Sequence, residues 1–317
     1  MTASSSVVVR LDRQEALPQH RSLNRGTVEC VERQSEIQES TVLVLTRRGA
    51  MRRYAICAVL CSFFTLGMTP RVAPTYENLN AVLWMQTSIE YRASATQVYR
   101  LAEQALTRGL KNPHWTAALE QTGNYESLPP AVILDLDETV LDNSVFEARM
   151  VNSGESYSTQ AWTKWVNERG AGLVPGAIEF LQFAHANGVA PLYITNRVCD
   201  PSKDDDATVR GLRSLQLPTE PIVDRLYCAR SSDDSDKTAR RAKCAAKYRI
   251  LLLFGDQLGD FVQIPPEVAS LEGREKLYEA HQNLWGERWF QLPNPMYGSW
   301  EGAVGYGLKE KLSRLRK

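Results

Sequence analysis

The sequence predicts an α/β fold in which helices flank a parallel β-sheet, with a small helical cap. Apolar segments of strand length alternate with helical segments from residue 130 onward, an order that is typical of parallel sheets. Of the 317 residues, 43% are hydrophobic and 23% are charged, which is enough to bury a substantial core. Lysine plus arginine and aspartate plus glutamate both number 37, so no basic excess indicates a nucleic-acid polymer. A small molecule is the expected partner.

The N-terminal region has the layout of a bacterial export signal. Met51, Arg52 and Arg53 precede an apolar run over residues 55–68, which is shorter than the roughly 20 residues that a membrane-spanning helix needs. We therefore expect a signal peptide over residues 51–73 and a folded domain over 74–317. Residues 1–50 are either an over-extended gene model or a disordered leader.

Export leads to an expected location in the periplasm or at the outer membrane, with membrane association through the signal. Lipid attachment at Cys57 or Cys61 is disfavoured, because Leu60 stands where a small residue is usual. The folded domain then keeps Cys199, Cys228 and Cys244. An oxidising compartment permits disulfides, so at most one can form and one thiol is left over.

A long amphipathic helix is predicted before the first strand, over residues 79–110. Its apolar stripe recurs at helical spacing and is expected to be a packing face: Trp84, Tyr91, Ala95, Val98, Ala102 and Ala105. Strands are predicted at 131–136, 189–195, 225–229, 250–254 and 289–292, and helices at 175–187 and 236–247.

Polar side chains lie at the carboxyl ends of three of these predicted strands. They are Asp135, Asp137 and Thr139 at the end of the first, Thr195, Asn196 and Arg197 at the end of the second, and Asp256 and Asp260 at the end of the fourth. The carboxyl ends of parallel strands meet at one edge of the sheet, where ligands bind. Clustered carboxylates repel one another unless a cation lies among them, and oxygen ligands suit Mg²⁺. The sequence thus predicts a magnesium site at this edge.

The same segments resemble a known enzyme family. "DLDET", "TNR", a lysine at 237 and "GDQLGD" occur in the order of the four motifs of the haloacid dehalogenase (HAD) superfamily of phosphatases. "LWMQTSIEY", "VILDLDETVLDNS", "LFGDQLGDF" and "LPNPMYGSWEGA" are similar to the bacterial class C acid phosphatases, the outer-membrane lipoprotein 5′-nucleotidases. The similarity runs from about Leu79 to Gly302. It implies a HAD-like Rossmannoid sheet, and a homodimer is one expectation because members of the family can be dimers.

The resemblance implies a role for each motif residue. Asp135 would be the nucleophile that becomes an aspartyl phosphate, and Asp137 would be the general acid and base. Thr195 and Lys237 would bind the transferring phosphoryl oxygens, with Asn196 among the substrate-binding residues. Mg²⁺ would be held by Asp135, Asp256 and the backbone carbonyl of Asp137, with Asp260 in support.

The sequence leaves open the roles of several basic residues near these motifs. Arg197 is either a phosphate ligand or a surface ion-pair partner. Lys237 shares the start of a predicted helix with Arg240 and Arg241, and basic residues in such a place are more often solvated.

Substrate specificity is expected in what covers the pocket. A small cap is predicted within about 145–174, together with the C-terminal region. Aromatic residues there more often fill a core than grip a ligand. The resemblance nevertheless places Trp162 and Tyr297 where a nucleobase is sandwiched, whereas Trp165 and Trp300 are expected in the core.

The sequence therefore predicts an exported, Mg²⁺-dependent acid phosphatase that acts on nucleoside 5′-monophosphates and other small phosphomonoesters. Two alternatives remain. One is a broad-specificity phosphatase of aryl or sugar phosphates. The other is a phospho-acceptor module like a response-regulator receiver, which also combines clustered aspartates, a threonine and a lysine, although receivers are about half this length.

Overall fold

The computed structural model describes residues 78–315. The expected leader (1–50) and signal peptide (51–73) lie outside this range, so those predictions stay predictions. Among the described residues, no helix is both long enough and apolar enough to cross a membrane.

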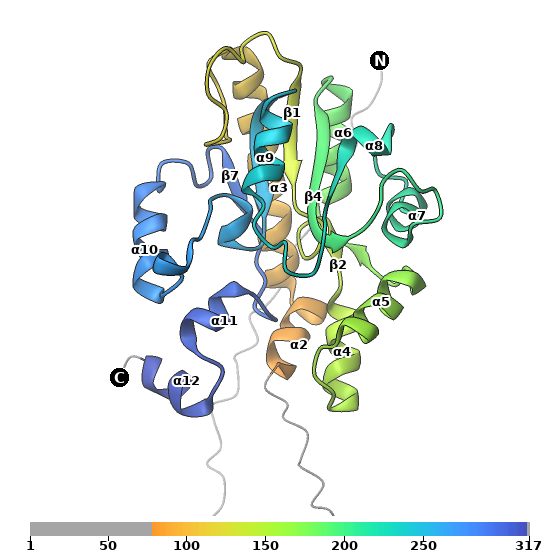
Figure 1. The fold of residues 1–317 in the computed structure, drawn as a ribbon, viewed down its shortest axis with the longest axis vertical. Coiled ribbons are helices and arrows are strands. Elements are labelled where there is room, and N and C mark those ends of the chain that lie inside the picture. Colours follow the sequence, from red (N-terminus) through yellow and green to blue (C-terminus); the bar gives the residue numbers. More distant parts are fainter. Residues whose placement is uncertain (1–77, 316–317) are drawn as a thin grey trace, which may run out of the picture. The chain divides into compact units, whose positions relative to one another are not determined.

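A parallel sheet of five strands in the order β5-β4-β1-β6-β7 forms the centre of the domain (Figure 1). The register places Leu134 of β1 beside Tyr193 of β4 and Phe254 of β6. The five predicted strands are all confirmed, with ends that differ by a few residues. Their bounds are β1 Pro130–Leu134, β4 Ala190–Val198, β5 Leu226–Ala229, β6 Arg249–Gly255 and β7 Trp289–Gln291.

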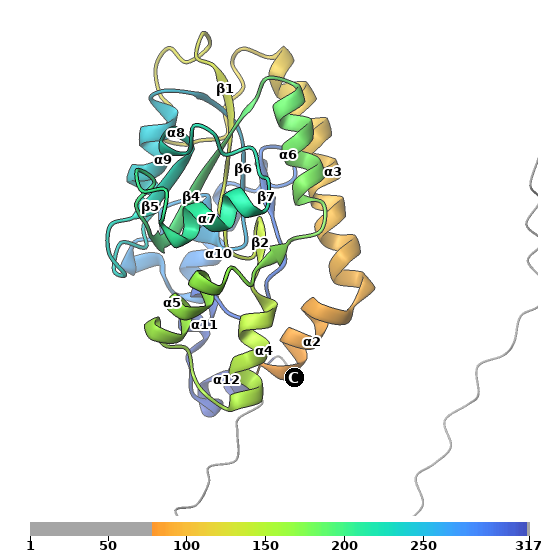
Figure 2. The ribbon, with the colours of Figure 1, turned by 90° about the vertical axis from the view of Figure 1, so that its right-hand side faces the viewer.

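Helices cover both faces of this sheet, which explains why its central strands are continuous apolar runs. α3 (Ile89–Lys111) and α6 (Ala177–Ala186) pack together on one face, and α9 (Thr238–Ala245) packs on the other (Figure 2). Every residue of β6 is buried. The predicted helices over 175–187 and 236–247 correspond to α6 and α9.

The predicted single helix over 79–110 is wrong in one respect, because it consists of two helices. α2 (Leu79–Thr87) ends before Ser88, whose backbone is extended and whose Oγ accepts a hydrogen bond from Tyr91 N (3.0 Å) at the start of α3. A serine N-cap satisfies backbone donors that a continuous helix would bond internally. The apolar stripe nevertheless faces one core on both sides of the break. Tyr91, Ala95, Ala102 and Ala105 of α3 are buried, and Trp84 of α2 is partly buried against the same cluster.

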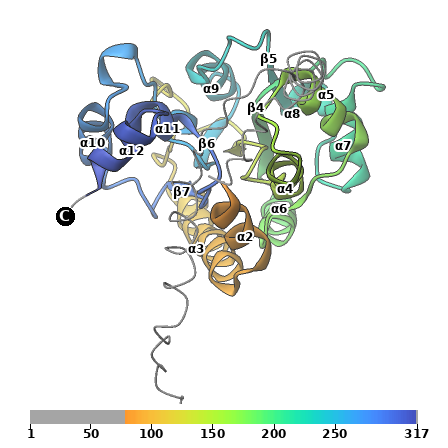
Figure 3. The same ribbon diagram turned by 90° about the horizontal axis from the view of Figure 1, so that it is seen from below.

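A small cap follows β1, as predicted. It comprises α4 (Ser144–Ser153), α5 (Thr159–Glu168) and an antiparallel pair of short strands, β2 (Leu141–Asp142) and β3 (Gly172–Leu173). In Figure 3 this cap and the C-terminal helices lie at the end of the domain nearest the viewer. The remaining α-helices are α7 Ala207–Ser214, α8 Ile222–Arg225, α10 Leu271–Ala280, α11 Ser299–Val304 and α12 Leu308–Arg314.

The three cysteines within residues 78–315 form one disulfide and leave one free thiol, an arrangement that the sequence allowed. Cys199, just after β4, is bonded to Cys228 in β5. Cys244 is a buried free thiol. The bond fixes the chain that follows the polar end of β4 to the neighbouring strand.

Candidate active site

The loop after β1 presents the first two aspartates. Asp135 N donates to Phe254 O of β6 (3.0 Å), so the loop begins in register with the sheet. Glu138 has a positive φ of 57°, and its Oε1 accepts from Asn143 N (2.8 Å), which closes the loop on itself. On the other side, Tyr99 Oη of α3 donates to Thr139 O (2.6 Å). The nucleophile candidate therefore lies on a tightly braced loop.

Lys237 is the residue just before α9, and its side chain contacts Asp135. Its Nζ donates to Asp135 Oδ1 and to Asp260 Oδ1, the latter at 2.6 Å. Burial raises the pKa of Asp135 to about 7, an effect that Lys237 opposes and that Asp260 and Asp137 reinforce. The sequence left open a solvated lysine here, but Lys237 is buried between the two carboxylates.

Asp135, Asp256 and Asp260 form an acidic cluster in which one carboxylate oxygen from each lies within 4.8 Å of the others. Burial first, and then Asp260 and Asp135, raise the pKa of Asp256 well above its usual value. Three such carboxyls are all charged only if a cation balances them, and an all-oxygen donor set fits a hard divalent ion. The cluster can hold such a metal. Asp260 also accepts from Lys237 through Oδ1 and from Gln257 N through Oδ2 (2.9 Å), which suits the expected supporting role.

The side chain of Asp137 is directed toward Arg197 and lies outside this cluster. Arg197 Nε donates to both carboxylate oxygens (3.1 and 3.0 Å) and Nη2 donates to Oδ1 (2.6 Å). Asn143 Nδ2 adds a bond to Oδ1 (2.9 Å). The sequence analysis left Arg197 as either a phosphate ligand or a surface ion-pair partner. The ion pair with Asp137 exists, but it does not lie at the surface, because only 7% of the arginine side chain is exposed.

Thr195 and Asn196 lie near the carboxyl end of β4, at the same edge of the sheet. Thr195 is buried and its Oγ1 accepts from Arg197 N (3.1 Å), whereas Asn196 is exposed at the pocket. Arg240 of α9 joins them to the lysine loop, since it donates to Thr195 O (2.5 Å), Asn196 Oδ1 (2.9 Å) and Asp236 O (3.2 Å). Arg240 and Arg241 are both buried, so they are structural arginines rather than solvated ones.

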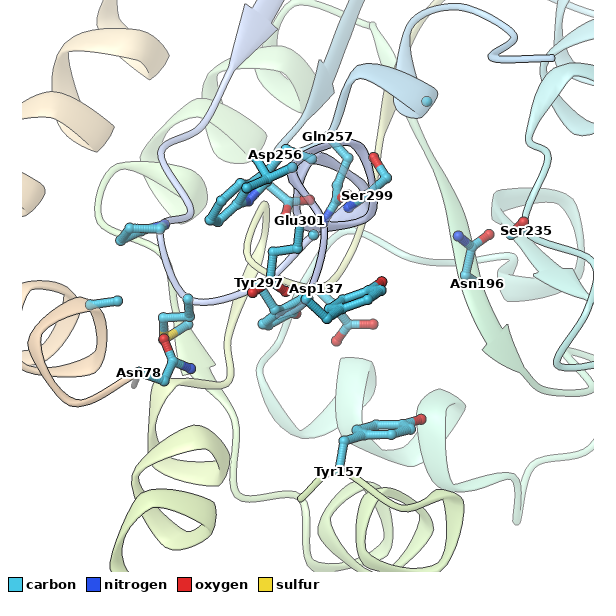
Figure 4. A pocket seen from close by; sticks show the side chains of 18 of the residues that line it. Asn78, Asp137, Tyr157, Asn196, Ser235, Asp256, Gln257, Tyr297, Ser299 and Glu301 are labelled. Atoms are coloured by element: carbon cyan, nitrogen blue, oxygen red, sulfur yellow. Dashed lines mark hydrogen bonds between the residues drawn. The ribbon is translucent and has the colours of Figure 1, made fainter. Parts of the chain in front are cut away.

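A pocket of about 1620 Å³ opens beside these residues. Trp162 of α5 and Tyr297, before α11, both line it, and the role in base binding that the sequence analysis gave them stays a prediction. In the view of Figure 4, Tyr297 and Asp137 lie between Asp256 on one side and Tyr157 on the other. Trp165 is in the core as expected, but Trp300 is not: it is 41% exposed and lines the pocket.

Three residues of this site were not assigned to it from the sequence. Tyr157 is 63% exposed, lines the pocket and lies 6.5 Å from Trp162 between ring centroids. Asn143 joins Asp137 to Trp165, whose Nε1 donates to Asn143 Oδ1 (2.8 Å). Arg240 braces the two loops described above. Asn143 follows Asp137 by six positions in the sequence, which gave a hint of its role, whereas the other two depend on contacts between distant segments.

Comparisons with known proteins agree with this geometry. Residues 59–300 match the family model of the HAD superfamily, subfamily IIIB (acid phosphatase). The class C acid phosphatase from Bacillus anthracis is 31% identical, and the match covers 76% of this chain and 98% of that one, with a TM-score of 0.64. The same enzyme with tungstate bound matches with a TM-score of 0.65. This chain therefore belongs to subfamily IIIB of the HAD superfamily and is an acid phosphatase of class C, a phosphomonoesterase.

Proposed function

We propose that this phosphatase hydrolyses nucleoside 5′-monophosphates, with Mg²⁺ as its metal, outside the cytoplasm. The observation that carries the proposal is the pocket beside Asp135 and Asp137, which is roomy and lined by aromatic rings from two sides of the fold. Trp162 and Tyr157 come from the cap, and Tyr297 comes from the C-terminal region. A flat base stacks favourably on such rings, whatever its identity.

The first displacement uses Asp135 as the nucleophile. One carboxylate oxygen attacks phosphorus, the bond from phosphorus to the 5′ oxygen breaks, and Asp137 gives a proton to the leaving alkoxide. Lys237 and Thr195 bind the phosphoryl oxygens, and Lys237 offsets the charge that accumulates there. Lys237 is suited to this because its ammonium already contacts Asp135.

The second displacement releases phosphate. Asp137, now deprotonated, takes a proton from a water molecule that attacks phosphorus, and the bond to Asp135 breaks. Asp135, Asp256 and the carbonyl of Asp137 would hold Mg²⁺, with Asp260 nearby, and the ion would neutralise charge on the carboxylates and the phosphoryl group. Tungstate is a tetrahedral oxyanion like phosphate, so its binding to the Bacillus anthracis enzyme supports an oxyanion site in this fold.

Export is supported by the Cys199–Cys228 disulfide, because such bonds persist mainly in oxidising compartments. The signal-like segment over residues 51–73 agrees with this location, and it leaves membrane association through the N-terminus as part of the proposal. N-terminal sequencing of the protein recovered from the periplasm would identify the mature end. Recovery of the full chain from the cytoplasm alone would contradict export.

The substrate class is tested by comparing adenosine 5′-monophosphate with ribose 5-phosphate. Both release the same kind of 5′ alkoxide, so their difference in kcat/KM isolates the contribution of the base. Stacking is worth about 1–3 kcal/mol per base, which predicts a preference of roughly five- to a hundred-fold for the nucleotide. Equal values would indicate the broad-specificity phosphatase instead.

A further inference from the structure

Arg197 contacts the carboxylate of Asp137 more extensively than any other residue that the structure places beside that carboxylate. Its Nε and Nη2 make three contacts with the two oxygens, at 2.6 to 3.1 Å. A guanidinium is a rigid planar fork, so contact through two nitrogens fixes the plane of the carboxylate as well as its position. Oδ1 accepts from Nε, Nη2 and Asn143, whereas within the described part of the chain Oδ2 accepts from Nε alone, at 3.0 Å. The pair thus leaves Oδ2 as the less engaged oxygen of Asp137.

Arg197 is itself held from two further directions. Its guanidinium carbon lies 5.3 Å from the ring centroid of Trp162, in cation–π geometry. Its backbone N donates to Thr195 Oγ1 (3.1 Å), and two residues later the Cys199–Cys228 disulfide fixes the chain to β5. A side chain that is braced in this way can transmit a fixed orientation to the group it binds.

The contacts of Arg197 favour a partner of Asp137 over a phosphate ligand. Two of its three guanidinium nitrogens, Nε and Nη2, donate to Asp137, the residue two positions after the nucleophile. The space beside Asp135, where a phosphate ligand would direct its donors, already holds the ammonium of Lys237. Most of the guanidinium is therefore engaged by the acid.

We propose that Arg197 is a positioning residue that orients Asp137 for proton transfer to the leaving group, with Trp162 as its support. This rests on the proposed role of Asp137 as the general acid and base. Arg197 neither gives nor takes the transferred proton and acts through Asp137. Its effect should therefore depend on how much the leaving group needs a proton, and should vanish when Asp137 can no longer supply one.

The test measures kcat/KM for a series of aryl and alkyl phosphates whose leaving alcohols differ in acidity, with saturating Mg²⁺. Arg197→Gln should lose about 10²-fold on alkyl phosphates, within the range of general acid catalysis, and less than about threefold on 4-nitrophenyl phosphate. Arg197→Lys keeps the charge but not the fork, so it should show the same pattern at smaller amplitude. In an Asp137→Asn background, Arg197→Gln should add little further loss, because the two residues act as one unit.

Arg149→Gln is the matched control. Arg149 also lies over a tryptophan of the cap, 4.9 Å from the Trp165 ring centroid, and pairs with Glu168 at 2.5 Å, but it does not contact the catalytic aspartates. Its removal should leave the dependence on the leaving group unchanged. Thermal melts of all variants show which are folded. If Arg197→Gln is unfolded, the comparison is made with Arg197→Lys.

Two results would overturn the proposal. A uniform loss across all leaving groups, accompanied by weaker inhibition by inorganic phosphate, would make Arg197 a phosphate ligand. An unchanged dependence on the leaving group in both Arg197 variants would remove any role in proton transfer. Because none of these substrates carries a base, either result is independent of whether nucleotides are the substrates.

Discussion

Lys237 Nζ lies between Asp135 and Asp260 and donates to a carboxylate oxygen of each, with 2.6 Å to Asp260. Only 4% of the lysine side chain is exposed. Burial by itself favours the neutral amine, but Asp135 and Asp260 outweigh it and raise the pKa of Lys237 above its usual value. The site therefore keeps one positive charge next to the nucleophile before any substrate binds.

Replacing this lysine should affect both stability and turnover. Lys237→Met leaves two buried carboxylates without their shared partner, and breaking a buried ion pair in this way typically costs about 3–5 kcal/mol. Loss of a donor to the phosphoryl group should lower kcat by about 10²–10³-fold. Denaturant unfolding and steady-state kinetics check the two effects. Lys243→Met, on the exposed side of α9, is the control and should change neither.

The two aspartates of the first loop should respond differently to substitution. Asp135→Asn removes the nucleophile and should abolish turnover on every substrate. Asp137→Asn should lose about 10²–10⁴-fold in kcat/KM for an alkyl phosphate and much less for an aryl phosphate with a good leaving group. Equal losses of the Asp137 variant on both substrates would contradict its assignment as the general acid.

Activity should require a divalent metal. EDTA should abolish turnover and Mg²⁺ should restore it, because the carboxylates of Asp135, Asp256 and Asp260 are clustered closely enough to share one ion. Asp256→Ala should raise the Mg²⁺ concentration that gives half-maximal activity. A titration of each protein with Mg²⁺ after chelation measures both, and activity that survives exhaustive chelation would disprove the metal site.

Glu147 of α4 should make stability depend on pH. Burial, together with Glu301, raises its pKa from 4.5 to about 7, although Asn78 Nδ2 donates to it at 3.3 Å. Between those values the folded chain keeps a proton that the unfolded chain releases, so the free energy of unfolding falls as pH rises from about 4.5 to 7. Glu147→Gln should remove this pH dependence. The free energy of unfolding of the variant minus that of the wild type should therefore be up to roughly 3 kcal/mol larger at pH 8 than at pH 4.

Urea unfolding of both proteins at several pH values measures this effect. Glu301→Gln provides a second variant, since it removes a charge that raises the pKa of Glu147. The transition should then move to lower pH. If the free energies of unfolding of the wild type and of Glu147→Gln depend on pH in the same way, the pKa of Glu147 is not raised in the folded protein.

The sheet and most of the site could be predicted from the sequence because their signals are local. Each strand of the sheet is a short apolar run, and Asp135, Thr195 and Asp256 directly follow such runs. Parallel pairing then brings these strand ends together at one edge. The break at Ser88 was missed because the apolar stripe continues through it, although a serine N-cap was present in the sequence.

Other features depend on contacts between distant segments, which no local pattern encodes. Arg197 and Asp137 are 60 positions apart in the sequence, so their buried contact is visible only in the folded structure. Arg240 likewise bonds Thr195 O across 45 positions. Trp300 was assigned to the core on the general behaviour of tryptophan, whereas its short helix leaves it at the pocket edge.

Trp162 is the residue on which the substrate proposal is most sharply testable. It packs edge-on to Phe146, with 5.2 Å between ring centroids, and lies under Arg197. Its truncation could therefore weaken base stacking, the orientation of Asp137, or both. Trp162→Ala should lower kcat/KM for adenosine 5′-monophosphate by roughly five- to a hundred-fold, from about 1–3 kcal/mol of stacking.

Ribose 5-phosphate separates the two roles of Trp162, because it shares the leaving group of the nucleotide but has no base. A loss common to both substrates measures support for Arg197, and the additional loss on the nucleotide measures stacking. Tyr297→Ala, which leaves Arg197 untouched, should affect the nucleotide alone. Trp165→Ala is the packing control: this tryptophan is 1% exposed, so its truncation should cost about 3–5 kcal/mol of stability. If Trp162→Ala lowers the Tm like Trp165→Ala and reduces both substrates equally, Trp162 is a packing residue and the nucleotidase proposal gives way to the broad-specificity phosphatase.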